Sequence, residues 1–288
     1  MLLNQVAGVL FDGLAYGMLL FLMSVGLSVT LGLMNFTNLA HGAFAMVGGY
    51  VTFALSREAG WPFLATLPFA FIASAVVAVA FERTLFRRLY GGGELNQVLF
   101  TIGLVFVAAA AAAYIFGAVN QSIDLPEALR GSFVVGELRL GRYRLFLIAV
   151  ALAVTILVAL GLEYTRFGAM VRAAVDNQRT ARGLGIDVNR VFAITFAIGS
   201  GLAGLGGALA IEITSLDPSF GFHYLVPMLI VVAVGGLGSI SGSFLAAALL
   251  GICDVTSKYL VPEIGAFMIY LVMVTILYWK PLGLLGRR

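Results

Sequence analysis

The sequence predicts an all-α, polytopic transmembrane helical bundle, and three observations support this class. The chain has 288 residues, of which 61% are hydrophobic and only 11% are charged. Repeated apolar runs of about 17–25 residues are typical of helices that span a membrane. Polar stretches separate these apolar runs, and the most charged stretch covers residues 163–190. Such a stretch must lie in water, because each unpaired charge at the bilayer centre costs at least ~2.5–3.5 kcal/mol.

We interpret residues 1–288 as one transmembrane domain with about eight crossings. The first span covers residues 6–31 and is too long for the apolar part of a signal peptide. Two segments interrupt the apolar pattern and are expected to be broken or re-entrant. One is the Gly- and Asn-rich stretch 32–42, and the other is the half-length run 225–234, which stops at 235–243. Breaks of this kind are tolerated at membrane depth where protein or a water-filled cavity surrounds them.

The distribution of positive charge predicts the orientation. If 82–94, 163–190 and the C-terminus face the cytoplasm, eleven of the 17 lysine and arginine residues lie on that side. The positive-inside rule favours this arrangement, which places the N-terminus outside. The polar connection 118–144 then lies outside the cell membrane, and its weakly alternating part is expected to form a small hairpin.

The two broken segments resemble each other. The first contains His-Gly-Ala-Phe at 41–44 and the second contains Ser-Gly-Ser-Phe at 241–244. Paired, Gly-interrupted segments in two halves of a chain are a pointer to a transport site near the membrane midplane. Asn35, Asn38 and His41 are candidates for contacting a zwitterionic solute there, or for satisfying the backbone groups that the break leaves free.

Motifs for chemistry are absent from the sequence. No glycine-rich loop ends in Gly-Lys-Ser/Thr, so no ATP-binding loop is predicted. The two histidines, His41 and His223, have no partners at metal-ligand spacing, and the single cysteine, Cys253, lies in an apolar run. A net charge of +3 gives no indication of nucleic-acid binding. An enzyme is therefore not expected.

The charged stretch 163–190 has helical periodicity between residues 167 and 183. Apolar residues fall on one face, while Arg172, Asp176 and Arg179 mark another. Gly183 and Gly185 are expected to end this one short helix. It could lie on lipid headgroups, but its mixture of acidic and basic side chains better fits a docking surface for a soluble protein.

Four segments of the chain resemble a known family, the permease subunits of branched-chain amino-acid ABC importers, and among them the shorter, H-type permease. The resemblance covers nearly the whole chain and is carried by NLAHGAFAMVGGY (38–50), RAAVDNQRTARGLGIDVNRV (172–191), VGGLGSISGSF (234–244) and KPLGLLGRR (280–288). Ala43 departs from the family, since many members carry an acid there. That departure leaves the solute open between branched-chain amino acids, urea, amides and aromatic acids.

The resemblance implies a complex in the cell inner (plasma) membrane. This chain would pair with a longer, related permease, two ATPase subunits would bind below and supply the ATP, and a solute-binding protein would deliver the solute from outside. The charged stretch would be the coupling helix, with ATPase contacts from Arg172, Asp176, Asn177 and Arg179, and with Gly185 turning the chain back. The solute path would be lined by Asn35, Asn38, His41, Gly42, Ser239 and Ser241.

A secondary transporter or channel for small polar solutes is the alternative. Broken helices and repeats suit that class as well. It would need ionisable residues inside the membrane, and the few candidates, Asp12, Glu212 and Asp254, are all predicted near the ends of spans.

Overall fold

The computed structural model describes residues 2–34, 38–89, 93–136 and 138–286 and is almost entirely helical. Eleven α-helices are present in the described residues. They are α1 (Leu2–Met34), α2 (His41–Phe53), α3 (Phe63–Thr84), α4 (Glu94–Phe116), α5 (Arg142–Tyr164), α6 (Arg166–Asp176), α7 (Gln178–Gly183), α8 (Val188–Thr214), α9 (Phe220–Gly235), α10 (Ile240–Leu260) and α11 (Pro262–Trp279). A π-helical turn, Ala54–Glu58, continues α2, and two 3₁₀ turns lie at Phe86–Arg88 and Glu127–Leu129.

The predicted polytopic helical bundle is confirmed. Seven of the described helices are long and apolar enough to cross a membrane, namely α1, α3, α4, α5, α8, α10 and α11. The shorter α2 and α9 have 13 and 16 residues. At 1.5 Å per residue they reach only ~20 and ~24 Å, less than the ~30 Å hydrocarbon core. The seven long and two short helices bracket the predicted count of about eight crossings.

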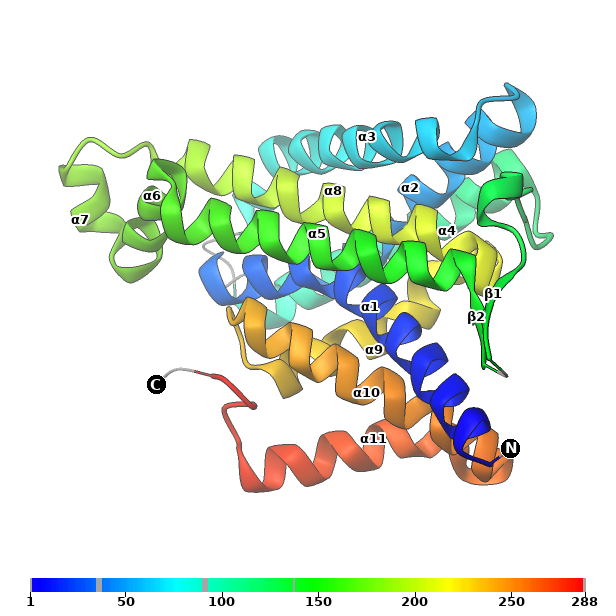
Figure 1. The fold of residues 1–288 in the computed structure, drawn as a ribbon. Coiled ribbons are helices and arrows are strands. Elements are labelled where there is room, and N and C mark those ends of the chain that lie inside the picture. The colour runs from blue at the N-terminus through cyan, green and yellow to red at the C-terminus, as the bar shows by residue number, and fades with distance from the viewer. Residues whose placement is uncertain (1, 35–37, 90–92, 137, 287–288) are drawn as a thin grey trace.

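The two ends of the bundle differ as the charge pattern predicts. Figure 1 shows the N-terminus and the hairpin at one end, and α6, α7 and the C-terminus at the other. The predicted hairpin consists of β1 (Ser132–Val135) and β2 (Leu138–Gly141), which pair in antiparallel register with Ser132 opposite Gly141. With the charged stretch in the cytoplasm, the hairpin end is the outer end.

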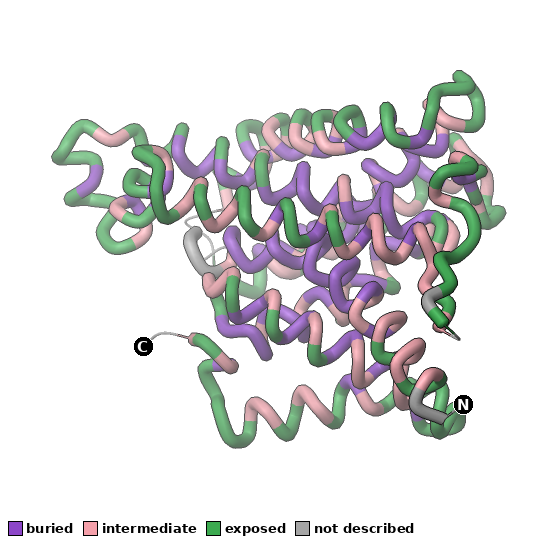
Figure 2. Tube along the Cα trace, viewed as in Figure 1, coloured by how far each residue is buried: buried purple, intermediate pink, exposed green. Residues whose placement is uncertain are grey.

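The centre of the bundle includes α1 and α8, which are the most buried of the seven long helices (Figure 2). They cross where Gly26 and Gly199 meet backbone to backbone. A second close approach joins Gly48 of α2 to Gly204 of α8. A side chain at any of these positions would collide with the neighbouring backbone, so glycine is what permits the contact.

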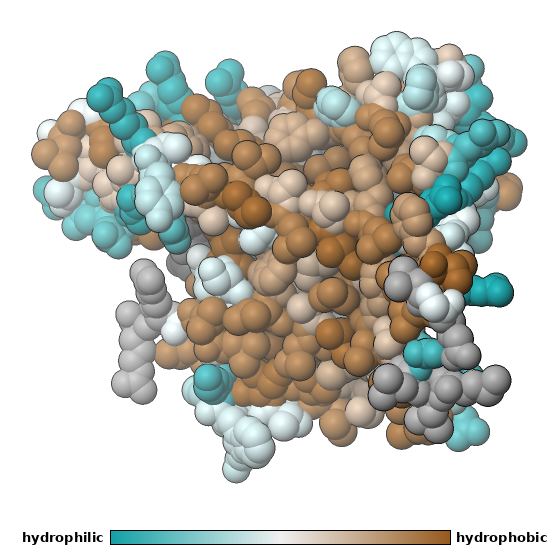
Figure 3. Space-filling model, in the orientation of Figure 1, coloured by the Kyte–Doolittle hydropathy of each residue, from teal (hydrophilic) through white to brown (hydrophobic). Residues whose placement is uncertain are grey.

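The outer helices α3, α4, α5 and α11 surround this centre and expose mainly apolar side chains. In the view of Figure 3, a continuous hydrophobic surface covers the middle of the molecule, and hydrophilic residues gather toward its two ends. This is the surface that a lipid bilayer requires of an integral membrane protein.

The internal repeat of the structure differs from the one that the similar segments 41–44 and 241–244 indicate. The packing relates α1–α4 to α8–α11: α1 lies against α8 and α10, and α8 lies against α1 and α3. The half-length helices α2 and α9 are the corresponding elements, and they touch where Gly42 meets the carbonyl of Gly221. The counterpart of the first break is therefore the α8–α9 connection, residues 215–219. It is not the α9–α10 turn that carries Ser241, because local sequence likeness does not determine which segments pack together.

Candidate functional site

The break between α1 and α2 is held by short-range polar contacts. Asn38 is fully buried, and its side-chain oxygen accepts a hydrogen bond from the Ala40 backbone N–H at 3.0 Å. The Leu39 N–H donates to the hydroxyl of Thr101 in α4 at 3.2 Å. These bonds satisfy backbone groups that the break leaves free, which supports the structural role of Asn38. Asn35, the other candidate amide, lies outside the described residues.

His41 is the first residue of α2 and is fully buried. Its ring lies near the Met23 backbone of α1, and neither ring nitrogen makes a well-formed hydrogen bond within the described residues. The side-chain nitrogen of Asn38 is in the same situation. Buried polar groups without partners are rare and costly, at about 1–3 kcal/mol each. Asn38 and His41 therefore both lie buried at the break, with side-chain nitrogens that make no well-formed hydrogen bond to the described residues.

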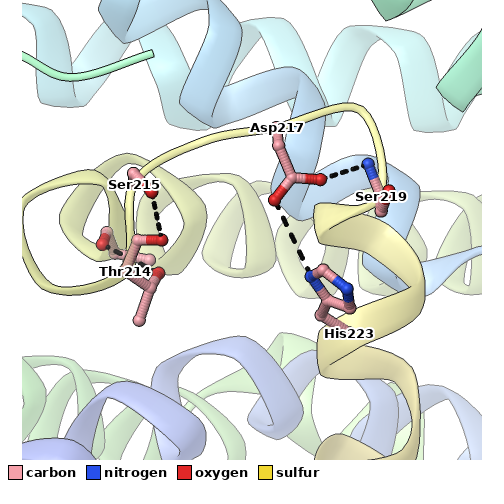
Figure 4. A network of polar contacts seen from close by, with 6 residues as sticks. Thr214, Ser215, Asp217, Ser219 and His223 are labelled. Atoms are coloured by element: carbon pink, nitrogen blue, oxygen red, sulfur yellow. Dashed lines mark hydrogen bonds and ion pairs between the residues drawn. The ribbon is translucent and has the colours of Figure 1, made fainter. Parts of the chain in front are cut away.

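The α8–α9 connection meets this break and carries a polar network that the sequence interpretation passed over. Ser215 takes a left-handed conformation (φ 52°), and the chain then runs through Asp217 to the start of α9. Figure 4 shows the Asp217 carboxylate between two partners. One oxygen accepts the Ser219 N–H at 2.5 Å, and the other lies 3.7 Å from His223 Nδ1.

This network is open on one side. The His223 side chain is 66% exposed, whereas that of Asp217 is 21% exposed. The segment SLDPSFGFHY reads locally as a short connecting loop, which is why these residues were not selected from the sequence. A signal was present, since an apolar run too short to cross the membrane begins beside an acid and a histidine.

Ser239 and Ser241, the other two predicted path residues, lie elsewhere. Ser239 caps α10 by accepting the Gly242 N–H at 3.0 Å, and Ser241 is exposed in the first turn of that helix. Both line a cavity of about 300 Å³ that also receives Glu163 and Arg172 from the opposite wall. The structure thus brings these serines to the charged stretch and not to Asn38 and His41.

The charged stretch forms two helices, so the prediction of one helix over 167–183 is wrong. The chain leaves the helical conformation at Asn177 (φ −156°, ψ 98°) between α6 and α7. The Asn177 side chain accepts the Thr180 N–H at 2.9 Å and so caps α7. Asparagine is a strong N-cap residue, and this capping competes with continuation of the first helix.

The faces of these two helices are as the periodicity predicts. Apolar side chains face the bundle, with Val171, Ala174 and Ala181 buried. Charged and amide side chains face outward, and the exposed ones include Arg172, Asp176, Asn177 and Arg179. We call these four residues the α6–α7 surface. Gly185 follows α7 in a left-handed conformation (φ 83°), which favours glycine and reverses the chain toward α8.

Two contacts hold α6 against the end of the membrane-spanning helix α5. The Arg172 guanidinium donates to the carbonyl of Leu162 at the end of α5. Gly168 lies so close to the Leu162 backbone that no side chain fits there. Thr165 caps α6 by accepting the Gly168 N–H at 3.1 Å. Movement of α6 is therefore expected to move the end of α5 with it.

The C-terminal segment forms the remaining wall of the cavity around Ser239. Backbone N–H groups of Leu284 and Leu285 donate to the carbonyls of Val234 and Gly235 at 2.7 and 3.2 Å. Gly283 packs against Gly236 at the end of α9. These contacts hold the Gly-rich segment 283–286 against the end of α9 and the α9–α10 turn.

Two of the three acids that an ion-driven mechanism would use form ion pairs. Asp12 pairs with Arg144 near the outer end. Asp254 is buried in α10 and pairs with Lys258, one turn further, at 2.7 Å. Glu212 is exposed and lines a hollow near the outer end with Arg130 and Arg144. The two paired acids are thus compensated by neighbouring basic groups.

A helical bundle with a hydrophobic surface, two half-length helices that meet inside it and charged helices at one end defines a polytopic membrane permease. The chain belongs to the family of the permease component of branched-chain amino acid transport systems, whose model matches residues 9–277. It is a multi-pass protein of the cell inner membrane and acts as a transport component.

Several curated proteins are similar along almost the whole chain. The high-affinity branched-chain amino acid transport system permease protein LivH of Escherichia coli K12 is 28% identical over 96% of this chain and 94% of its own length. The corresponding BraD protein of Pseudomonas aeruginosa is 29% identical over 96% and 95%. A probable permease LivM of Methanocaldococcus jannaschii is 30% identical over 58% of this chain and 52% of its own. No solved structure matches the chain.

Proposed function

We propose that this chain is the H-type permease subunit of an ABC importer for branched-chain amino acids or related small polar solutes. Two separate ATPase subunits bind and hydrolyse ATP, and the chain itself uses no cofactor. A second, related permease pairs with it in the membrane, and a solute-binding protein delivers the solute from outside. The names of its relatives support the solute class and, through LivM, a second permease of similar sequence.

The observation that carries this proposal is the α6–α7 surface. It lies outside the hydrophobic belt, at the end of the molecule opposite the hairpin (Figure 1). Its mixed charges, Arg172 and Arg179 with Asp176 between them, suit a protein partner, because charge complementarity determines the register of docking. The apolar sides of both helices are already buried against this chain, so the charged side is what remains for a partner.

The contacts around α6 would transmit its movement to the membrane-spanning helices. Arg172 is bound to the end of α5, and it shares a cavity with Ser239 and Ser241 of the α9–α10 turn. Displacement of α6 by an ATPase would therefore act on α5 and on the base of α9 together. The other end of α9 is where the two breaks meet.

Charge reversal tests this function. Arg179→Glu changes an exposed side chain, so membrane insertion is expected to remain normal while co-purification with the ATPase subunits and solute uptake are both lost. Arg172→Glu, which also removes the bond to the end of α5, is expected to leave ATP hydrolysis uncoupled from solute uptake. The measurements are pull-down of the ATPase subunits and uptake by vesicles that contain the whole complex.

The matched control is Arg139→Glu, which reverses an exposed arginine of β2 at the opposite end. It is expected to leave ATPase binding unchanged. Normal pull-down and normal uptake by the Arg179→Glu and Arg172→Glu complexes would show that the docking interpretation is wrong. Uptake of leucine by the purified chain alone, driven by an ion gradient, would replace the ABC function with secondary transport.

A further inference from the structure

The polar network at the start of α9 extends from the outer connection, where Leu216 pairs with Gln121, into the membrane. The Phe222 ring packs on Phe106 with ring centroids 4.6 Å apart, and Phe106 is near the middle of α4. Gly221 lies beside Val105, the central residue of the same helix. Since α9 spans only ~24 Å and ends at the cytoplasmic side, its first turn must begin inside the hydrocarbon layer.

His223 is therefore an exposed, ionisable side chain within the thickness of the membrane. The outer helices provide the comparison. Across the described middle sections of α3, α4, α5 and α11, exposed side chains are aliphatic or aromatic, apart from the hydroxyls of Tyr270 and Thr275. Thr275 donates its hydroxyl to its own helix at Leu271. The exposed edge around His223 thus does not have the composition of a lipid-facing surface.

Asp217, the acidic partner of His223, also sets this region apart from the lipid-facing surfaces of the outer helices. The Asp217 carboxylate is bound to a backbone N–H and faces the His223 ring, and the aspartate side chain is also partly exposed. Ionisable groups at membrane depth typically face a bundle interior or a water-filled cavity, because lipid gives them no hydrogen bonds. Asp217 lies within the α8–α9 break and His223 follows it, and this region meets the buried His41 segment through the contact between Gly42 and Gly221.

We propose that the Asp217–His223 pair lies in a water-filled part of the solute pathway, on the face of α9 that this chain turns away from lipid. The pair offers an anionic oxygen and an imidazole to one solute, which fits the ammonium and carboxylate groups of an amino acid or the amide of a related compound. This assignment rests on the transport function proposed above and adds a location and a pair of solute contacts to it.

Cysteine accessibility tests the location. Cys253, the chain's one cysteine, is first replaced by alanine, and His223→Cys is introduced in that background. The assembled complex in right-side-out vesicles is treated from outside with a charged, membrane-impermeant methanethiosulfonate reagent. The matched control is Leu271→Cys, in the middle of α11, where the native side chain is 59% exposed.

The cysteine at 223 is expected to react at least roughly tenfold faster than the one at 271, because the thiolate is the reactive form and an apolar environment suppresses it. Solute-loaded binding protein is expected to slow the reaction at 223 only. Equal, slow labelling at both positions would overturn the proposal. If His223→Cys fails to assemble, Ser219→Cys replaces an exposed residue of the same network with a near-isosteric one, and the same comparison applies.

This experiment separates the two proposals. Labelling requires neither ATP hydrolysis nor uptake, so the pathway assignment can fail while the charge-reversal results on the α6–α7 surface hold. Conversely, normal pull-down and uptake by the Arg179→Glu and Arg172→Glu complexes, together with fast labelling at 223, would overturn the coupling function and leave the water-filled pathway in place.

Discussion

Helices α8 and α11 are both apolar enough to cross a membrane, yet they occupy opposite environments. Within this chain 78% of an apolar 18-residue section of α8 is buried, against 11% of the 18 residues of α11. Their difference lies in side-chain size, since α8 carries five glycines between residues 199 and 207 and α11 carries large aliphatic and aromatic residues. Hydropathy therefore identifies both helices as membrane-spanning, whereas small residues determine which helix packs in the centre of the bundle.

A side chain added to the small face of α8 should have the largest effect. The Cβ of Gly207→Val would collide with the Ala45 backbone carbonyl in α2. Overpacking typically costs about 1–3 kcal/mol, and a backbone clash lies at or above the upper end of that range. We expect loss of the monodisperse peak in detergent gel filtration. Gly103→Val in α4 faces open space and should keep the peak; a normal peak for both would contradict the comparison.

Removal of a large side chain from each helix should give the next largest difference. Phe196 of α8 is fully buried between the rings of Phe44 and Phe86, with centroids 5.7 and 5.5 Å away. Phe196→Ala leaves a cavity and is expected to cost about 3 kcal/mol. Phe267→Ala in α11 removes a ring that faces lipid, so its effect on thermal unfolding in detergent–lipid micelles should be small.

Buried hydroxyls sharpen the comparison further. Ser243 of α10 donates to Ser28 of α1 at 3.0 Å inside the bundle, whereas Thr275 of α11 bonds to its own helix. Ser243→Ala is expected to lower the free energy of unfolding by about 0.6 kcal/mol, the average for a hydrogen bond between membrane helices. Thr275→Ala should have no measurable effect. Denaturation curves of the two variants, compared with the native chain, decide this; equal losses would mean that the bond between helices adds nothing.

The amino-acid sequence was sufficient to predict the class and most local elements. Apolar runs must form helices in lipid, because every backbone N–H and C=O has to be satisfied within the segment. The same reasoning places the charged stretch in water, and its buried and exposed faces follow from the helical period. The hairpin at 132–141 was also predictable, whereas the break at Asn177 was missed because a side-chain cap competed with helical periodicity.

The candidate site shows where local sequence stops being informative. Asn38 and His41 could be selected because a Gly- and Asn-rich break is visible in the sequence. For Asp217 and His223 the short apolar run beside them is only a weak signal, because their significance depends on depth and on exposure, which neighbouring residues do not encode. Their roles in solute transport, and those of the α6–α7 surface, remain predictions for the experiments above.

By itself, then, the sequence determined that this chain is a membrane-embedded bundle with water-exposed charged helices, since hydrophobicity and period are local properties of a segment. The tertiary structure alone decided that α1 and α8 form the centre, that the α1–α2 break meets the α8–α9 connection, and that Ser239 and Ser241 join Arg172. These outcomes depend on contacts between residues far apart in the chain, where glycines permit the helix backbones to approach closely.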